Sequence, residues 1–233
     1  MRVGIIGGTG WQGAGVAARL VYAGNTVLVG SRHISRSRHI ATQLPRALGL
    51  PAEQFIPVTN QQAAQEGEWV FVTLPITAHR TVLAELRDYL QGKLVVDVTA
   101  PVNPYNQIEN LWPCEGSALQ EAEAVLGEGV TVVGALKNIS ASALLNLNKP
   151  VNGDVFVMGR DLGARHKVAG LLRQMGLNPY DVGYGDVCRT VEGLTSLLIY
   201  LNYAYHLQQP GIKVQPMEPG IEFIPDETLL PPK

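Results

Sequence analysis

The chain has 233 residues, of which 46% are hydrophobic and 16% charged, so it can bury a sizeable core in one large domain or in one domain with a smaller companion. Its formal net charge of −2 excludes a general polyanion-binding surface, and we expect no nucleic-acid partner. The longest apolar stretch, 194–207, is interrupted by Asn202 and His206 and is shorter than the about 20 residues of a membrane span, so we expect no membrane partner.

The two cysteines, Cys114 and Cys188, are far apart and follow neither a metal-binding nor a redox spacing. We therefore expect reduced, packed thiols, no disulfide framework and no metal site. The chain begins with its first predicted strand and not with a charged and then apolar leader, which favours a cytoplasmic protein.

The first predicted element is a buried strand that ends in a glycine turn. The apolar run 3–6 precedes a G-x-G-x-x-G pattern, and apolar residues then recur at helical spacing from Val16. Such a turn lets the backbone approach a pyrophosphate, whose charge the N–H groups of the following helix bind. A glycine turn in an ordinary parallel sheet is the alternative, but the context favours dinucleotide binding. The predicted contacts in this turn are Gly8, Gly10, Trp11, Gln12 and Gly13.

The second predicted strand, 26–29, ends where a dinucleotide-binding fold contacts the adenosine ribose. An NAD site has Asp or Glu at this position, which accepts a hydrogen bond from the ribose 2′-hydroxyl. This chain has Ser31 and Arg32, and no acidic residue precedes Glu53. Because a hydroxyl and guanidinium groups bind a 2′-phosphate that a carboxylate would repel, we expect NADP(H). Arg36 is a further candidate and Arg38 a weaker one, the alternative being a solvated basic start to a helix.

The remaining chain alternates strands with helices, which predicts an α/β, Rossmann-type, doubly wound and mainly parallel sheet with a small C-terminal helical part. The further strands are expected at 55–58, 70–74, 94–98, 130–135 and 154–158, and the helices at 35–49, ended or broken near Pro45, 60–66, 78–90, 117–126, 162–175 and 191–208. Thr73, Leu74 and Pro75 lie at the C-terminal end of a buried strand, where open sheets bind ligands, so we expect contacts with the ribose or nicotinamide.

The segment 99–113, the last helix and the C-terminal tail remain to be interpreted. The proline-bearing segment 99–113 is either a rigid loop over the site, with Pro101 and Val102 as cofactor contacts, or a plain surface crossover. The tyrosines of the helix 191–208 are expected in the core or a subunit interface. We divide the chain into an NADP-binding domain (1–185), a C-terminal helix that completes the cleft and forms the dimer interface (186–213), and a proline-rich tail (214–233).

Several motifs occur in order: GIIGGTGWQGAG, VGSR, VTLP, VVDVTAPV, SALQEAEAVLGEGVTVVGALKNISAS and GIKV. From residue 1 to about 214, the chain resembles the NADPH-dependent coenzyme F420 reductases, also called F420H2:NADP oxidoreductases. The resemblance implies a homodimer that passes hydride between NADP(H) and the deazaflavin coenzyme F420 or a related, F0-like deazaflavin. It also implies that Thr9, Ser31, Arg32 and Arg36 hold NADP, and that the deazaflavin stacks on the nicotinamide under the C-terminal segment. The tail after Val214 has no counterpart in the family pattern.

Within GALKNISAS, Asn138 and Ile139 match the family pattern and are predicted site-wall residues, whereas Lys137 stands where the family usually has His. Lys137 is the candidate catalytic residue, as a positive charge that stabilises a reduced deazaflavin. The alternative is a solvated lysine at a strand end without a catalytic role. Two other functions stay open. One is an NADPH-dependent reductase of a flavin, carbonyl or imine with Lys137 as proton donor. The other is a non-enzymatic NADPH sensor.

Overall fold

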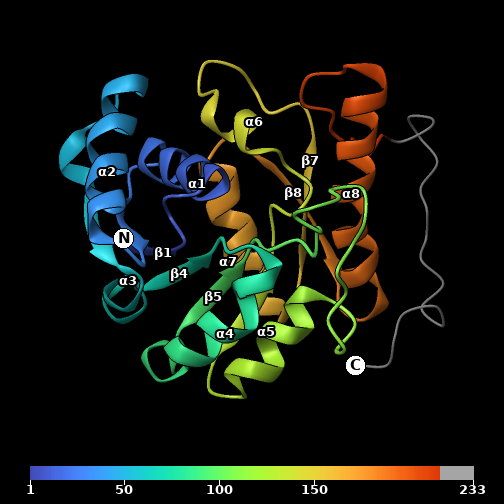
Figure 1. Ribbon diagram of the computed structural model, residues 1–233, viewed down its shortest axis with the longest axis horizontal. Coiled ribbons are helices and arrows are strands. Elements are labelled where there is room, and N and C mark those ends of the chain that lie inside the picture. Colours follow the sequence, from blue (N-terminus) through green and yellow to red (C-terminus); the bar gives the residue numbers. More distant parts are fainter. Residues whose placement is uncertain (216–233) are drawn as a thin grey trace.

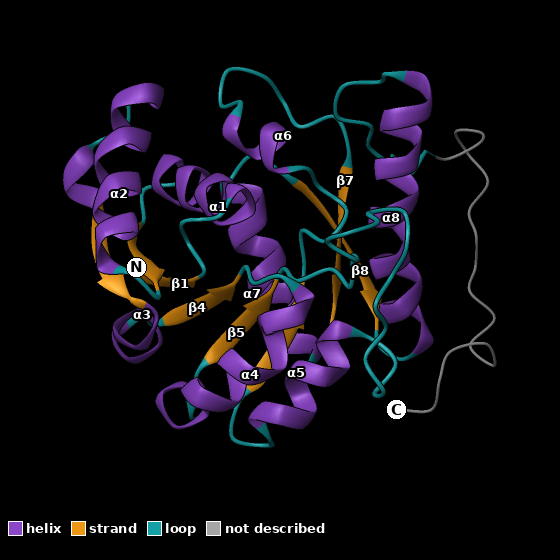
Figure 2. Ribbon diagram, in the orientation of Figure 1, coloured by secondary structure: helices purple, strands orange, loops and turns teal. Residues whose placement is uncertain are grey.

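The computed structural model describes residues 1–215 and has one central sheet with helices on both faces (Figures 1 and 2). Its eight strands are β1 (Arg2–Ile6), β2 (Thr26–Ser31), β3 (Phe55–Thr59), β4 (Trp69–Val72), β5 (Leu94–Asp97), β6 (Thr131–Gly134), β7 (Asp154–Met158) and β8 (Asn178–Gly183). The α-helices are α1 (Trp11–Tyr22), α2 (Ile34–Leu48), α3 (Asn60–Glu66), α4 (Ile76–Leu86), α5 (Ala118–Leu126), α6 (Ala141–Leu145), α7 (Leu162–Gln174) and α8 (Asp186–Tyr205). Short 3₁₀ turns cover Ala52–Gln54 and Arg87–Leu90.

The strand order is β3-β2-β1-β4-β5-β6-β7-β8. The first six strands in this order are parallel, β7 runs antiparallel to β6, and β8 is parallel to β7. The order of the first six is that of doubly wound dinucleotide-binding folds, in which ligands bind where the order reverses, between β1 and β4. The predicted fold class is therefore confirmed.

Side chains that alternate along the strands build a separate core on each face of the sheet. Val3 and Ile5 of β1 belong to the core under α1, α2 and α7, whereas Ile6 belongs to the core under α4 and α5. The side chains of the central strands β4 and β5 alternate in the same way, and Phe71 and Val96 belong to the same core as Val3 and Ile5. Buried apolar residues on both faces explain why these strands are nearly continuous apolar runs in the sequence.

The structure corrects several predicted boundaries. Helix α2 does not end or break near Pro45 but continues to Leu48 and ends at Gly49, whose φ of 67° is left-handed. Helix α8 begins five residues earlier than predicted, at Asp186. Strand β8 was not predicted, because this last strand of the sheet is half exposed and lacks an apolar alternation.

Helix α8 lies at the opposite side of the molecule from α2, beside β7 and β8 (Figure 1). Among residues 1–215, no helix is both long and apolar enough to cross a bilayer. The proline-rich tail is described only at residues 214 and 215, so the prediction for 216–233 lies outside the described residues.

Candidate functional site

The glycine turn connects β1 to the N-terminus of α1. Gly10 is the N-cap of α1 and supplies no side-chain cap, so the first N–H groups of the helix stay available to an anion. A Cβ on Gly13 would lie 2.6 Å from the carbonyl oxygen of Gly7, whereas a Cβ on Gly10 would meet nothing closer than 3.6 Å. Gly13 therefore serves close packing inside the turn, and Gly10 leaves the outer surface of the turn open.

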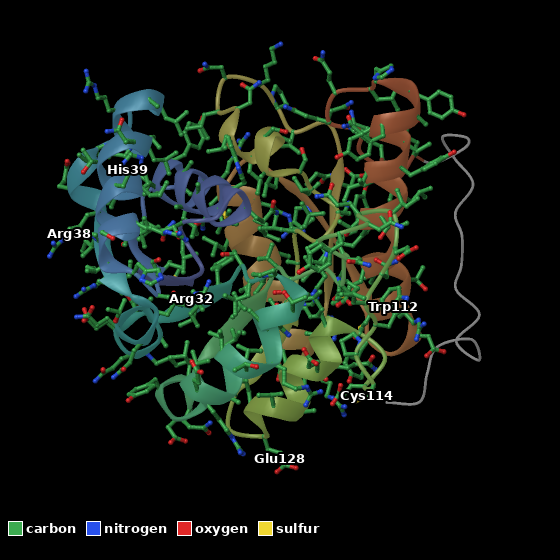
Figure 3. The ribbon with its side chains drawn as sticks, viewed as in Figure 1. Arg32, Arg38, His39, Trp112, Cys114 and Glu128 are labelled. Carbon is green, nitrogen blue, oxygen red and sulfur yellow. The ribbon has the colours of Figure 1, made fainter. Side chains whose placement is uncertain are left out.

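The polar residues predicted to bind a 2′-phosphate gather beside this turn. The hydroxyl oxygens of Thr9 and Ser31 are 3.4 Å apart, and the N–H of His33 donates to the Ser31 hydroxyl. Arg32 and Arg36 are exposed, and neither forms an ion pair with any described residue. In Figure 3, Arg32 lies toward the centre of the molecule, whereas Arg38 points outward from α2.

A cavity of about 670 Å³ opens at the C-terminal edge of the sheet, between the glycine turn and α8. Cavities of this size hold small-molecule ligands. Ten of the predicted site residues line it: Gly10, Trp11, Gln12, Thr73, Leu74, Pro75, Val102, Lys137, Asn138 and Ile139. Its far wall is α8, which contributes Thr195, Leu198, Ile199, Asn202 and Tyr203.

The other predicted residues do not line this cavity. Gly8 and Gly13 are buried within the turn, and the Thr9 hydroxyl of the turn lies beside that of Ser31. Arg32 and Arg36 follow Ser31 in the chain and are exposed. Pro101 is buried, and its carbonyl oxygen accepts a hydrogen bond from the N–H of Leu111. The segment 99–113 therefore lines the cavity at Thr99, Ala100, Val102 and Gln107 but not at Pro101.

Lys137 lies between β6 and α6 and lines the cavity. Its ammonium group has three hydrogen-bond acceptors. Its Nζ atom lies 2.7 Å from Asp97 Oδ2, 3.0 Å from Glu192 Oε1 and 2.6 Å from the carbonyl oxygen of Thr99. All three charged side chains are fully buried. Burial by itself opposes the charge, but the two carboxylates outweigh it and raise the pKa of Lys137. The alternative of a solvated lysine is therefore wrong, and a catalytic role stays a prediction.

The ion network continues from Asp97 through His79 to the surface. His79 Nε2 lies 3.2 Å from Asp97 Oδ1, and His79 Nδ1 lies 2.8 Å from Glu121 Oε1. The half-exposed Arg80 donates to the other oxygen of this carboxylate, Glu121 Oε2, at 3.0 Å. Burial alone would lower the pKa of His79, but Asp97 and then Glu121 raise it to about 9. Burial would raise the pKa of Asp97, but Lys137 and His79 hold it well below its usual range.

Three residues that line the cavity each have a buried polar atom without a hydrogen-bond partner among the described residues: Thr99 (Oγ1), Asn138 (Oδ1) and Asn202 (Oδ1). Buried polar atoms without partners are rare because each costs about 1–3 kcal/mol.

Sequence reasoning missed the buried acidic partners of Lys137 and the polar residues of α8. Asp97 directly follows an apolar run, and Glu192 lies within an apolar stretch of its helix. A carboxylate in such a position indicates a buried acidic residue with a partner, so both could have been noticed in the sequence. Glu192 also accepts from the N–H groups of Ala118 and Leu119 at the start of α5, so it joins two helices to Lys137.

The strand order and the glycine turn define the chain as a Rossmann-type α/β protein, a class that includes many oxidoreductases. The profile of the family described as "NADP oxidoreductase coenzyme F420-dependent" matches residues 2–101. The F420-dependent NADP reductase of Methanothermobacter thermautotrophicus is 34% identical over 92% of this chain and 94% of that protein. That of Methanocaldococcus jannaschii is 33% identical over 94% of this chain and 100% of that protein. The chain belongs to the F420-dependent NADP reductase family, as the resemblance implied.

Two further comparisons concern a part of a longer protein and a solved structure. Metalloreductase STEAP3 of Rattus norvegicus is 33% identical over 85% of this chain, but the match spans only 37% of that protein. A crystal structure from Arthrobacter sp. FB24, assigned as an F420-dependent NADP reductase, superimposes with a TM-score of 0.76 at 23% identity over 92% of this chain and 99% of that one. At this identity the second likeness concerns the fold alone.

Proposed function

We propose that this protein is an oxidoreductase that transfers hydride between NADP(H) and the deazaflavin coenzyme F420. The observation that carries the proposal is membership of the F420-dependent NADP reductase family over nearly the whole chain. When bound, the nicotinamide and the deazaflavin supply the hydride donor and acceptor, so the protein itself needs no nucleophile.

Two neighbouring groups of residues would bind the phosphates of NADP(H). The turn at Gly8, Gly10 and Gly13 and the N-terminus of α1 would bind the pyrophosphate. Thr9, Ser31, Arg32 and Arg36 would bind the 2′-phosphate, because a hydroxyl and free guanidinium groups suit a dianion.

The cavity would hold the two reacting rings against each other and exclude water from them. Its predicted wall residues, from Trp11 and Gln12 through Thr73–Pro75 to Asn138 and Ile139, form the nucleotide side, and α8 forms the opposite side. A rigid wall on both sides supplies the positioning that hydride transfer requires.

Lys137 would act through its charge and not as a proton donor. All its described contacts are acceptors, and its raised pKa keeps the ammonium group protonated. A fixed ammonium group behind the cavity wall, paired with Asp97 and Glu192, would set the local charge beside an acceptor ring.

The test of this function mixes the purified protein with NADPH and, in turn, F420, F0, FMN and a panel of carbonyl compounds, and follows the absorbance of each acceptor. We expect rapid reduction of the deazaflavins alone. Reduction of carbonyl compounds without deazaflavin turnover, or tight NADPH binding without turnover of any acceptor, would overturn the proposal.

We also propose that the protein is a cytoplasmic homodimer. Leu197 and Tyr200 on α8 are about half exposed, and the apolar loop around Ile108 lies beside them, joined to α8 by the Tyr203 hydroxyl and Gln107. Exposed apolar side chains of this size suit a subunit interface. The free thiols of Cys114 and Cys188 suit a reducing compartment.

Light scattering of the protein as it elutes from a sizing column tests the dimer. We expect twice the chain mass for the unmodified protein and the monomer mass for Tyr200→Glu. The exposed residue Thr42 on α2 provides the matched control Thr42→Glu, which should stay dimeric. A monomeric unmodified protein would contradict the proposal.

A further inference from the structure

One short stretch of chain contributes six consecutive residues, 137–142, to the lining of the cavity. We call residues 136–146, which include this stretch and all of α6, the wall segment. Helix α6 has only five residues, and helices this short are not stable by themselves in water. The position of the wall segment therefore depends on its contacts with the rest of the molecule.

The beginning of the wall segment is held by a side chain of α1. The Nε2 atom of Gln12 donates to the carbonyl oxygen of Ile139 at 3.1 Å and lies 3.5 Å from that of Leu136. The amide group of Gln12 thus joins the first turn of the nucleotide-binding helix to the backbone of the cavity wall.

The end of the wall segment is held by a second side chain of α1, two turns further along. The guanidinium group of Arg19 is 3% exposed and donates to the carbonyl oxygens of Leu144 at 2.9 Å and Asn146 at 2.8 Å. It also donates to that of Ala143 at 3.2 Å. These carbonyl groups lie at the end of a helix, where they lack partners within the helix, so one buried arginine fixes the whole last turn of α6.

Between these two side chains, a glycine lets α6 approach α1 closely. Gly15 is three residues after Gln12 and four before Arg19, so all three lie on one face of α1. A Cβ at Gly15 would lie 2.8 Å from the Cβ of Leu144 and 3.1 Å from the carbonyl oxygen of Ala141. Figure 1 shows α6 beside α1.

We infer that Gln12, Gly15 and Arg19 are positioning residues that fix the wall segment to the nucleotide-binding helix. The helix whose N-terminus receives the pyrophosphate thereby also determines where the cavity wall stands beside the reacting rings. Gly15 and Arg19 do not line the cavity, so they act only through the wall segment. The inference rests on the proposed hydride transfer but not on F420 as the acceptor.

The test compares Gly15→Ala with the unmodified protein. The added methyl group displaces α6 and leaves the glycine turn untouched, and a displacement of about 1 Å beside reacting groups can cost about 100-fold in rate. We expect the single-turnover rate of F420 reduction by bound NADPH to fall about 10- to 100-fold. The dissociation constant of NADPH, measured by calorimetry, should change by less than about threefold.

Gly170→Ala on α7 is the matched control, because a Cβ there meets no atom within 4 Å, and it should change neither quantity. Arg19→Lys keeps the charge and loses the planar group that reaches several carbonyls, so its rate should fall about 3- to 30-fold. If Gly15→Ala does not fold, Arg19→Lys carries the same comparison. A normal rate in the folded variant, or an equal loss of rate and NADPH affinity, would overturn the inference.

Hydrogen exchange followed by mass spectrometry tests the wall segment without any hydride acceptor. The amides of residues 143–146 should exchange faster in Gly15→Ala than in the unmodified protein and in Gly170→Ala. Unchanged exchange in Gly15→Ala would overturn the inference whether or not an acceptor is reduced. If the unmodified protein reduces a different acceptor, only the proposed role of F420 is wrong, and the rates are compared with that acceptor.

Discussion

The ammonium group of Lys137 and the carboxylate of Asp97 form a fully buried ion pair, with 2.7 Å between Nζ and Oδ2. Lys137 follows β6 and Asp97 ends β5, so the pair links two neighbouring strands at the edge where the cavity opens. Glu192 extends the pair to α8, and the Thr195 hydroxyl, which also lines the cavity, donates to the carbonyl oxygen of Lys137. The same lysine therefore connects both walls of the cavity.

Replacement of Lys137 tests this structural role. Lys137→Ala leaves Glu192 buried without a counter-charge and leaves Asp97 with His79 alone, and breaking a buried ion pair typically costs about 3–5 kcal/mol, which should lower the Tm by roughly 10 °C. Thermal unfolding followed by circular dichroism measures the change, and Lys149→Ala, at an exposed position, is the control. An unchanged Tm combined with lost hydride transfer would instead assign Lys137 a direct chemical role.

The raised pKa of His79 predicts how stability depends on pH. Because the folded-state pKa of about 9 exceeds the unfolded value of roughly 6.5, the stabilisation is fully present below about pH 6.5 and is lost as the pH rises through 9. We expect the Tm to fall by roughly 3–8 °C between pH 6.5 and 9.5. His79→Gln should show a flatter profile over this range, and an equally steep profile in that variant would contradict the assignment.

Arg32 should discriminate between the two nicotinamide dinucleotides. Arg32→Ala removes a charge-assisted contact with the 2′-phosphate, worth about 1.5–3 kcal/mol, so the dissociation constant of NADPH should rise about 10- to 150-fold. The constant for NADH, which has no such phosphate, should hardly change. Arg38→Ala is the control because Arg38 points outward from α2 (Figure 3). Equal losses for both nucleotides would mean that Arg32 does not contact this phosphate.

The glycines of the turn should respond differently to the same small substitution. Gly13→Ala places a Cβ within 2.6 Å of a backbone oxygen, so we expect a lower Tm, by roughly 5 °C or more. Gly10→Ala meets no protein atom closer than 3.6 Å and should keep the Tm within a few degrees, but its methyl group occupies the open face of the turn. NADPH affinity should therefore fall by about tenfold or more. Normal NADPH binding by Gly10→Ala would show that the phosphates do not approach there.

The sequence alone predicted the fold class and the glycine turn, because both depend on short-range patterns. A buried strand, three glycines and an amphipathic helix follow one another within residues 2–22, and the first six strands are apolar runs that any parallel sheet requires. The family was recognised for the same reason, since its motifs are contiguous stretches. The predicted phosphate contacts are also local, because Ser31, Arg32 and Arg36 follow the end of one strand.

Only the tertiary structure revealed the surroundings of Lys137. Asp97 and Glu192 are 40 and 55 positions from Lys137 in the chain, so no local pattern links them. Burial and hydrogen bonding depend on which strands and helices become neighbours, and these interactions decide whether a lysine is a solvated surface group or a fixed charge beside a cavity. The residue types were visible in the sequence, but their electrostatic environment is a property of the folded chain.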